Sequence, residues 1–255
     1  MKGLTHIVPS RAAVLTSFGE SSCQGISPRF SALVWNIYKA KRVTWATDFY
    51  WLTRGKDLVL LQEAFLRPAM LEVIEKADHL RWDLAAGFTR KMAAIDAGVM
   101  TGSQAEPEEI FFLRSKAREP VVRLPKMVIG TTYPIRESRK KLLVLNVHAI
   151  NFVTMPNFRR QMRQLEEKII LHRGPVLLGG DFNTWLARRS NFLNNMTEDL
   201  GMELATFSPD RRSRHFGRCI DHVFVRGIKI LSASCHYEIG SSDHQPIELE
   251  LEILG

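Results

Sequence analysis

The sequence predicts an α/β protein in which two packed β-sheets are covered by helices. Short apolar runs of strand length alternate along the chain with segments of helical periodicity. In residues 247–253 an apolar residue alternates with glutamate at a period of two, which is typical of a half-buried strand. In residues 157–172 apolar residues recur at helical spacing while arginine and lysine occupy other faces. Because such elements bury only one face, they must stack in layers.

The other elements are predicted in chain order from the same two periodicities. Residues 32–36 and 58–63 are expected to be buried strands, with a helix at residues 45–53 between them and another at residues 68–77. Further strands are expected at residues 98–102, 121–133, 142–147, 176–178 and 220–225. The basic run 136–141 directly precedes a strand and is predicted to be an exposed hairpin turn.

Length and composition predict one large domain behind a leader. The 255 residues, 45% hydrophobic and 24% charged, suffice for a substantial core. Residues 1–28 are predicted to be a partly ordered leader and residues 29–255 the domain. No run of about 18 apolar residues occurs, so no transmembrane segment is predicted. The three widely spaced cysteines, an odd number, favour a reducing compartment and therefore the cytoplasm.

Polar residues that bind metals or transfer protons close or follow four of the predicted strands, and a fifth group precedes the last one. These residues are Asn36, Glu63, His148, the pair Asp181 and Asn183, and Asp243 with His244. Placing such groups at the ends of buried strands costs desolvation free energy unless they face a common polar cleft. The sequence therefore predicts one active site assembled from distant segments.

The segment Asp181-Phe182-Asn183 is the sharpest local signal. In an extended strand end, residues two apart point the same way, so the carboxylate and the amide could act together on a water molecule and a phosphate oxygen. Phe182 would then enter the core. The alternative is an Asx-turn after the glycine pair that precedes Asp181.

Asp221 and His244 form a second candidate pair. A partly buried carboxylate fixes the tautomer of an imidazole and stabilises its charged form. Asp221 would supply that carboxylate to His244. The alternative is a salt bridge from Asp221 to Arg218 or another arginine.

The formal charge of +8 and the pI near 9.6 favour an anionic partner. Cationic clusters follow Asn36 and Asn183 and precede Asp221; their members are Lys39, Lys41, Arg42, Arg188, Arg189, Arg211, Arg212, Arg214 and Arg218. Two interpretations stay open, since these clusters either surround the cleft and bind phosphates or form a solvated basic surface.

The absence of common catalytic signatures narrows the chemistry. The chain contains no GxSxG elbow, no phosphate loop, no GxGxxG and no HExxH. The remaining candidates are rich in oxygen ligands with histidines beside them, a combination that suits Mg²⁺, with Mn²⁺ as the alternative, better than zinc. Cys219 and His222 have half of a zinc-site spacing, but no second pair follows.

Six motifs in a fixed order carry a resemblance to a known family. They are LVWN ending at Asn36, LLQE ending at Glu63, NVHAIN around His148, GGDFN at residues 179–183, CIDHVFV around Asp221 and SSDH ending at His244. Over about residues 30–253 they resemble the DNase I-like endonuclease/exonuclease/phosphatase superfamily. LVWNIYK, LVLLQEA, HAINF, GPVLLGGDFN and FGRCIDHVFVRG more closely resemble its bacterial YafD-like branch.

This resemblance implies a four-layer α/β/β/α sandwich of two mixed, mainly antiparallel sheets and a Mg²⁺-dependent phosphoester hydrolase. It implies that Glu63 is the principal metal ligand, with Asn36 and Asp243 nearby. Nucleases of the abasic-site type place an acidic residue two positions after the first asparagine, where this chain has Tyr38. That departure argues against the abasic-site specialisation, and His148 in place of a tyrosine favours the DNase I or sphingomyelinase pattern.

The resemblance also implies the roles of the catalytic residues. Asp181 would orient or deprotonate the attacking water, and Asn183 and His148 would bind the scissile phosphate. His244, paired with Asp221, would stabilise the pentavalent transition state or protonate groups around it. We further predict that substrate contacts come from Asn151, Arg188 and Arg218.

Three functions are compatible with these residues. The favoured one is a metal-dependent phosphodiesterase or nuclease that acts on nucleic acid, since phosphate contacts supply affinity without reading sequence. The second is a hydrolase of phospholipid headgroups or small phosphate esters. The third is a non-catalytic nucleic-acid-binding protein, which would require that the acidic and histidine residues no longer act. The sequence predicts no particular oligomeric state.

Overall fold

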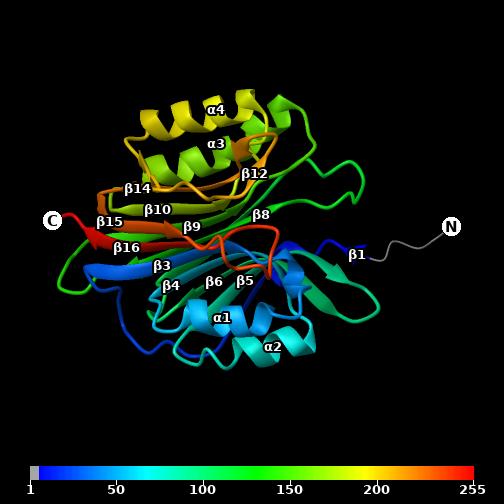
Figure 1. Cartoon of the computed structure of the whole chain (residues 1–255), viewed down its shortest axis with the longest axis horizontal. Coiled ribbons are helices and arrows are strands. Elements are labelled where there is room, and N and C mark those ends of the chain that lie inside the picture. Colours follow the sequence, from blue (N-terminus) through cyan, green and yellow to red (C-terminus); the bar gives the residue numbers. More distant parts are fainter. Residues whose placement is uncertain (1–5) are drawn as a thin grey trace.

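Residues 6–255, which the computed structural model describes, form two large β-sheets packed face to face with helices on both outer sides (Figure 1). Helices α1 (Trp45–Thr53) and α2 (Pro68–Ile74) cover the first sheet. Helices α3 (Met155–Leu171) and α4 (Ala187–Asp199) cover the second. The predicted four-layer α/β/β/α sandwich is confirmed.

The first sheet has the order β1-β5-β6-β4-β3-β16-β15, and β2 also pairs with β5. Its strands are β1 (His6–Ile7), β2 (Leu15–Phe18), β3 (Arg29–Asn36), β4 (Leu58–Phe65), β5 (Arg81–Arg90), β6 (Ile95–Ser103), β15 (Ile228–Cys235) and β16 (Ile247–Ile253). Within the described residues the pairing is antiparallel except between β3 and β4, which run parallel. The carboxyl ends of β3 and β4 therefore meet at one edge, which brings Asn36 near Glu63.

The second sheet has the order β11-β14-β10-β9-β8-β7. Its strands are β7 (Glu109–Arg114), β8 (Met127–Pro134), β9 (Lys141–His148), β10 (Val176–Asp181), β11 (Glu203–Leu204) and β14 (Asp221–Arg226). Here the described strands are antiparallel apart from β9 and β10, whose parallel register sets Asp181 beside His148. A separate hairpin of β12 (Arg214–His215) and β13 (Arg218–Cys219) leads into β14, and short 3-10 turns lie at Arg11–Ala13 and Tyr38–Ala40.

Alternating side chains build the core between and outside the sheets. Val34 and Leu60 of the first sheet share the inter-sheet core with Val144 and Leu177 of the second. The intervening residues pack outward, as Leu33 does against the α1 and α2 layer. Burying one such side chain contributes about 1.5–3 kcal/mol, which fixes the strand ends that carry the polar groups.

The predicted elements agree closely with the structure in most places. The predicted helix at residues 45–53 and the last strand have the same bounds as α1 and β16. The helix predicted at residues 68–77 ends at Ile74. The strand predicted from residue 121 is wrong in its first part, because the chain turns before Pro125 and the strand begins only at Met127.

The predicted leader contributes structure to the first sheet. From residue 6 onward it supplies β1 and β2, which pair with β5, while residues 1–5 of the leader lie outside the described part of the chain. Across residues 6–255, none of the helices combines the length and the apolar character needed to cross a bilayer.

Candidate active site

Three neighbouring strands of the second sheet place their polar residues side by side. The register sets Asp181 beside His148 on parallel β9 and opposite Asp221 on antiparallel β14. Burial is nearly complete, since Asp181 and Asp221 are 3% exposed and His148 is 6% exposed. Charged groups this deep are retained only where partners compensate the loss of hydration. The sheet therefore holds a compact acidic and histidine cluster at its edge.

The first sheet joins this cluster through Asn36. Its Nδ2 donates a hydrogen bond to Asp181 Oδ2 at 3.1 Å, which links the two sheets at the site. The segment Ser242 to His244 is held against the same strand end. Ser242 Oγ donates to the Asn36 carbonyl at 2.6 Å, and Trp35 Nε1 donates to the His244 carbonyl at 3.1 Å.

His244 and Asp221 form the closest pair in the site. His244 Nδ1 lies 2.8 Å from Asp221 Oδ2 and 3.0 Å from Oδ1. Burial alone would lower the pKa of His244, but the charge and the hydrogen bond of Asp221 outweigh it and raise the pKa to about 10. The imidazole is therefore held protonated. Within residues 6–255, no salt bridge joins Asp221 to Arg218 or to another arginine, so the pairing with His244 is the one present.

Asp181 lies at the centre of the cluster. Its Oδ2 is 3.5 Å from His148 Nε2 and 4.0 Å from His244 Nε2. Burial raises the pKa of Asp181 to about 7, and the opposing charge of His244 only partly offsets this effect. Its Oδ1 accepts a hydrogen bond from the Asn183 backbone amide at 2.9 Å, which is an Asx-turn contact. The Asx-turn and the strand-end arrangement are therefore both present. Phe182, which lies between Asp181 and Asn183, is fully buried.

His148 is held neutral beside a lysine that the sequence analysis did not single out. Lys126 Nζ lies 3.0 Å from His148 Nε2 and 3.6 Å from Glu119 Oε1. Burial and then the charge of Lys126 lower the pKa of His148 well below its ordinary value. Lys126 directly precedes β8 and belongs to none of the motifs, so only the three-dimensional structure places it here.

Glu63 reaches the cleft through a β-bulge. The pairing of β4 with β6 shifts between Leu61 and Ala64, and Glu63 adopts the left-handed backbone conformation with φ 56°. Leu61 and Ala64 both pack outward under α1 and α2, although residues three apart in a regular strand point to opposite faces. The extra residue of the bulge accounts for this, and it lets Glu63 point toward the cleft instead of toward the helices. Its Oε2 is buried and lies 3.2 Å from Lys39 Nζ without a hydrogen bond.

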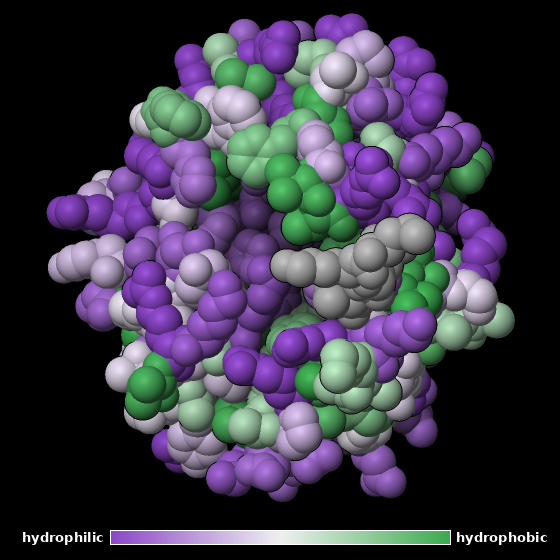
Figure 2. Space-filling model, turned by 90° about the vertical axis from the view of Figure 1, so that its right-hand side faces the viewer, coloured by the Kyte–Doolittle hydropathy of each residue, from purple (hydrophilic) through white to green (hydrophobic). Residues whose placement is uncertain are grey.

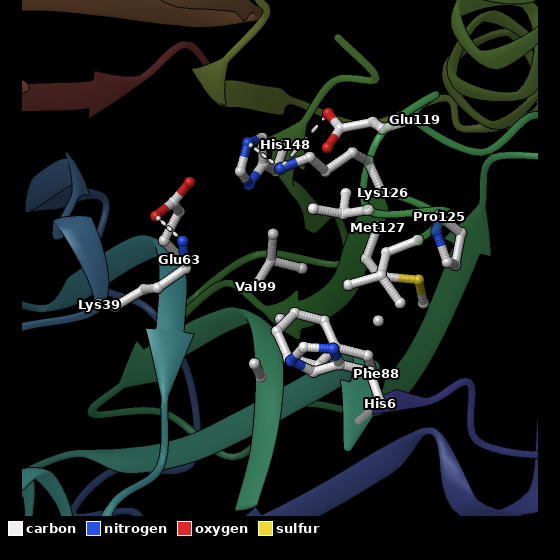
Figure 3. Close-up of a pocket in the computed structure, with 15 residues that line it drawn as sticks. His6, Lys39, Glu63, Phe88, Val99, Glu119, Pro125, Lys126, Met127 and His148 are labelled. Carbon is white, nitrogen blue, oxygen red and sulfur yellow. Dashed lines mark hydrogen bonds and ion pairs between the residues drawn. The ribbon is translucent and has the colours of Figure 1, made fainter. Parts of the chain in front are cut away.

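A pocket of about 300 Å³ opens beside Glu63 (Figure 3). Four charged residues and the neutral His148 line one part of it; the charged ones are Lys39, Glu63, Glu119 and Lys126. The remaining wall is mainly apolar, with Phe88, Val99 and Met127 among its residues. The predicted catalytic residue His148 therefore borders both the buried cluster and an open pocket.

The side of the molecule that carries these strand ends is hollowed. Because β16 runs to the left in Figure 1, the antiparallel β3 ends on the right. Figure 2 faces that right-hand side and shows a depression lined mainly by hydrophilic residues, with hydrophobic residues on its rim.

The three predicted metal ligands lie at different depths around the cluster. Asn36 contacts Asp181, Glu63 lines the pocket, and the residue Asp243 is exposed next to His244. Among the described residues, Asp181, Asp221 and His244 form a group of three whose possible ligand atoms all lie within 4.8 Å of one another. The metal roles of Asn36, Glu63 and Asp243 stay predictions.

The predicted substrate-contacting residues also differ in their surroundings. Asn183 Nδ2 donates to the Ala149 carbonyl at 2.9 Å. Asn151 Oδ1 accepts hydrogen bonds from Trp185 Nε1 at 2.7 Å and from the Phe152 amide at 2.8 Å. Arg188 and Arg218 are exposed.

Arg189 is a structural residue of the site, whereas the sequence predicts for its cluster either phosphate binding around the cleft or a solvated basic surface. It is 1% exposed, and its guanidinium donates to the carbonyls of Ile150, Asn183 and Val153 at 2.9–3.2 Å. These carbonyls belong to the loops that follow β9 and β10. Arg189 therefore ties together the two loops that carry predicted phosphate-binding residues.

Comparison with known proteins agrees with this geometry. The model of the endonuclease/exonuclease/phosphatase family matches residues 33–244. The chain belongs to this family, whose members are in general phosphoric ester hydrolases. The superfamily that the six motifs predict is confirmed.

The similar proteins also support the predicted branch. The chain is 36% identical over 221 residues to a UPF0294 protein of Yersinia pseudotuberculosis, covering 86% of this chain and 82% of the relative. A UPF0294 protein of Yersinia enterocolitica matches with the same identity and coverage. These UPF0294 relatives correspond to the YafD-like branch.

Solved structures share the fold at low sequence identity. An endonuclease/exonuclease/phosphatase from Beutenbergia cavernae superposes with a TM-score of 0.67 at 16% identity, covering 89% of this chain and 72% of that one. The human Nocturnin catalytic domain gives 0.64 at 13% identity, covering 94% and 97%. A mannosyl-6-phosphatase of Bacteroides thetaiotaomicron gives 0.63 at 16% identity, covering 87% and 99%.

Proposed function

We propose that the protein is a Mg²⁺-dependent phosphodiesterase that cleaves nucleic acid, with Mn²⁺ as the alternative ion. The observation that carries the proposal is the convergence of His148, Asp181, Asp221 and His244, together with Asn36, in one buried cluster. Groups with shifted pKa values in a cleft are candidates for proton transfer. The free cysteines support the predicted cytoplasmic location, and residues 29–255 would form the catalytic domain.

The residues around the cluster suit a divalent cation. Glu63 Oε2 is buried without a hydrogen bond, and burial raises the pKa of Asp181, so a nearby cation would stabilise the charged form of both carboxylates. Hard oxygen donors are the ligands that Mg²⁺ prefers. Glu63, Asn36 and Asp243 would hold the ion, which when bound would offset negative charge on the phosphoryl oxygens.

The protein's own side chains would bind the phosphate and carry out the proton transfers. Asp181 would orient the attacking water and accept its proton, for which a pKa of about 7 is suited near neutral pH. His148 and Asn183 would contact the phosphate oxygens. His244, kept protonated by Asp221, would stabilise the charge of the pentavalent state and donate a proton to the leaving oxygen.

Charge supports nucleic acid as the substrate. The net charge of +8 favours association with a polyanion, and cationic contacts to phosphates give affinity independent of sequence. Arg188 and Arg218 are exposed, so their guanidinium groups would be available to contact phosphates.

The pocket supports a second candidate, a hydrolase of small phosphate esters or phospholipid headgroups. A space of about 300 Å³ with a mainly apolar wall is at the lower end of the range for small-molecule sites. It would accept a compact organic group attached to the phosphate.

A substrate panel tests the proposal. We expect wild-type protein to cleave plasmid DNA, RNA or bis(p-nitrophenyl) phosphate with Mg²⁺ or Mn²⁺ and to lose this activity with chelator. Asp181→Ala and His244→Ala should each lower kcat/KM by about 10²–10⁴-fold, the usual contribution of a positioned acid or base. Asp78→Ala, an exposed carboxylate beyond α2, is the control with unchanged activity.

Two outcomes would contradict the proposal. Wild-type turnover in Asp181→Ala and His244→Ala would show that the cluster takes no part in catalysis. Hydrolysis of sphingomyelin or sugar phosphates with no cleavage of DNA or RNA would favour the second candidate.

A further inference from the structure

Three aromatic rings form a row on the surface beside the cleft. The Trp185 ring lies between the other two, with its centroid 5.9 Å from Phe152 and 5.7 Å from Phe216. Phe152 is 67% exposed and Phe216 is 87% exposed. Contiguous exposed apolar groups commonly mark a site of interaction. We call these three residues the aromatic row.

The aromatic row is carried by the same segments that carry the site. Phe152 lies in the loop after His148, Trp185 follows Asn183, and Phe216 lies at the turn of the β12–β13 hairpin that leads to Asp221. Trp185 is held in place, because its Nε1 donates to Asn151 Oδ1 at 2.7 Å. A ligand stacked on the row would therefore lie against the same segments that carry the site residues.

The backbone holds both phenylalanines in an unfavourable conformation. Phe152 has φ 51° and Phe216 has φ 49°, the left-handed region that bulky side chains rarely adopt. Both rings are nevertheless largely exposed, so burial does not account for these conformations. Strained residues of this kind gather at ligand-binding sites.

Unpaired cations flank the aromatic row in the sequence. Arg188 follows Trp185 and Arg218 follows Phe216, and in the part of the chain that the structure describes neither forms a salt bridge. Aromatic faces together with free guanidinium groups match a ligand with flat rings on a phosphate chain. In a duplex the base faces are already stacked, so the matching ligand is a single strand.

We propose that the aromatic row stacks the unpaired bases of a single-stranded nucleic acid whose scissile phosphate lies in the cleft. The inference rests on the proposed function for the cleavage step. Stacking itself is measurable without cleavage, so the two are tested separately.

Binding to a labelled oligothymidylate in the presence of chelator tests the aromatic row directly. We expect Phe216→Ala to raise the Kd for the single strand about tenfold, within the range for loss of one stacked base. Tyr50→Ala on α1 is the matched control, since Tyr50 is 58% exposed on the outer helical layer and should leave the Kd unchanged. An unchanged Kd in Phe216→Ala would overturn the proposal.

Two conservative variants separate base stacking from contact with a lipid surface. Phe216→Trp keeps a flat ring and should bind the oligonucleotide at least as tightly as wild type. Phe216→Leu keeps apolar area without a ring face and should bind as weakly as Phe216→Ala. If Phe216→Leu bound like wild type, or if wild type bound phosphatidylcholine vesicles but no oligonucleotide, stacking would be refuted.

Activity distinguishes failure of this inference from failure of the proposed function. With Mg²⁺, Phe216→Ala should lower the ratio of kcat/KM for a single-stranded oligonucleotide to that for bis(p-nitrophenyl) phosphate about tenfold. An unchanged ratio would overturn the stacking proposal while the phosphodiesterase stands. If wild type hydrolysed neither substrate, the phosphodiesterase proposal would fail, and the binding assay would still decide whether the aromatic row stacks bases.

Discussion

The two ends of the cleft satisfy their charges in different ways. At the hydrogen-bonded end, both oxygens of Asp181 and both oxygens of Asp221 have donors from Asn36, Asn183 or His244. At the pocket end, Glu63 has an ion pair with Lys39 but no hydrogen bond at Oε2, and Lys126 is shared by Glu119 and His148. The first end is preorganised, whereas the second holds pairs that an incoming ion or phosphate can replace.

The preorganisation of the hydrogen-bonded end depends on Arg189. Arg189→Met would remove the donors to the Ile150, Asn183 and Val153 carbonyls, and the bonds to the first two are buried. We expect the free energy of unfolding to fall by about 3 kcal/mol, since each lost bond to a charged group contributes about 1.5–3 kcal/mol and is partly offset by the desolvation cost of the arginine. Urea unfolding measures this change.

Its neighbour provides a matched control. Arg188 is exposed on the same helix, so Arg188→Met should change the free energy of unfolding by no more than about 0.5 kcal/mol. Equal unfolding midpoints for the two variants would contradict the role of Arg189.

A buried histidine behind the hydrogen-bonded end makes stability depend on pH. His222 lies 2.8 Å from Thr184 Oγ1, and burial followed by the charge of Arg212 lowers its pKa to about 4. Between about pH 6.5 and 4 the unfolded chain binds a proton that the folded protein does not, so stability falls as the pH falls. At about 1.36 kcal/mol per pH unit, the loss from pH 7.5 to 4.5 is about 2.5 kcal/mol.

Comparison with a variant that does not titrate isolates this effect. His222→Gln should lose about 2.5 kcal/mol less than wild type when urea unfolding is measured at pH 7.5 and at pH 4.5. Equal losses in both proteins would show that His222 is not the group responsible.

Much of the hydrogen-bonded end could be predicted from the sequence. Asn36, His148, Asp181 and Asp221 each end or begin a strand whose apolar run is plain, and the resemblance of the motifs implies one shared site, although the pairing order of the strands does not follow from the sequence. The pairing of His244 with Asp221 also follows from the expected protonation chemistry and is present in the structure.

The pocket end was harder to predict for physical reasons. Glu63 reaches it through a bulge, and strand periodicity does not reveal a bulge. Lys126 lies in a loop segment that was predicted to be strand, so nothing indicated its approach to His148. Strand β5, which lines the pocket, is buried on both faces and contains small residues, so it lacks the alternation that marks a strand.

The fold contained similar gaps. Helix α4 was not predicted because its sequence, ARRSNFLNNMTED, has few apolar residues and many asparagines, which are weak helix formers. Its packing against α3 and the buried Arg189 stabilise it instead. Neither interpretation of its cluster, phosphate binding or a solvated surface, places Arg189 in the interior, because adjacent arginines give no sign in sequence of which one is buried.

The pocket end can be tested through the binding of the metal. Glu63→Gln removes the charge of the predicted principal ligand and should raise the Mg²⁺ dissociation constant about tenfold, or about 1.4 kcal/mol. Lys39→Met removes the cation 3.2 Å from the same carboxylate and should lower that constant a few-fold, because like charge no longer opposes the ion. Titration calorimetry measures both constants without substrate.

Lys41→Met is the control, since the Lys41 ammonium lies over the Tyr38 ring at 4.0 Å from its centroid, and its removal should leave Mg²⁺ binding unchanged. Identical constants in wild type, Glu63→Gln and Lys39→Met would place the ion elsewhere and would remove the proposed difference between the two ends of the cleft.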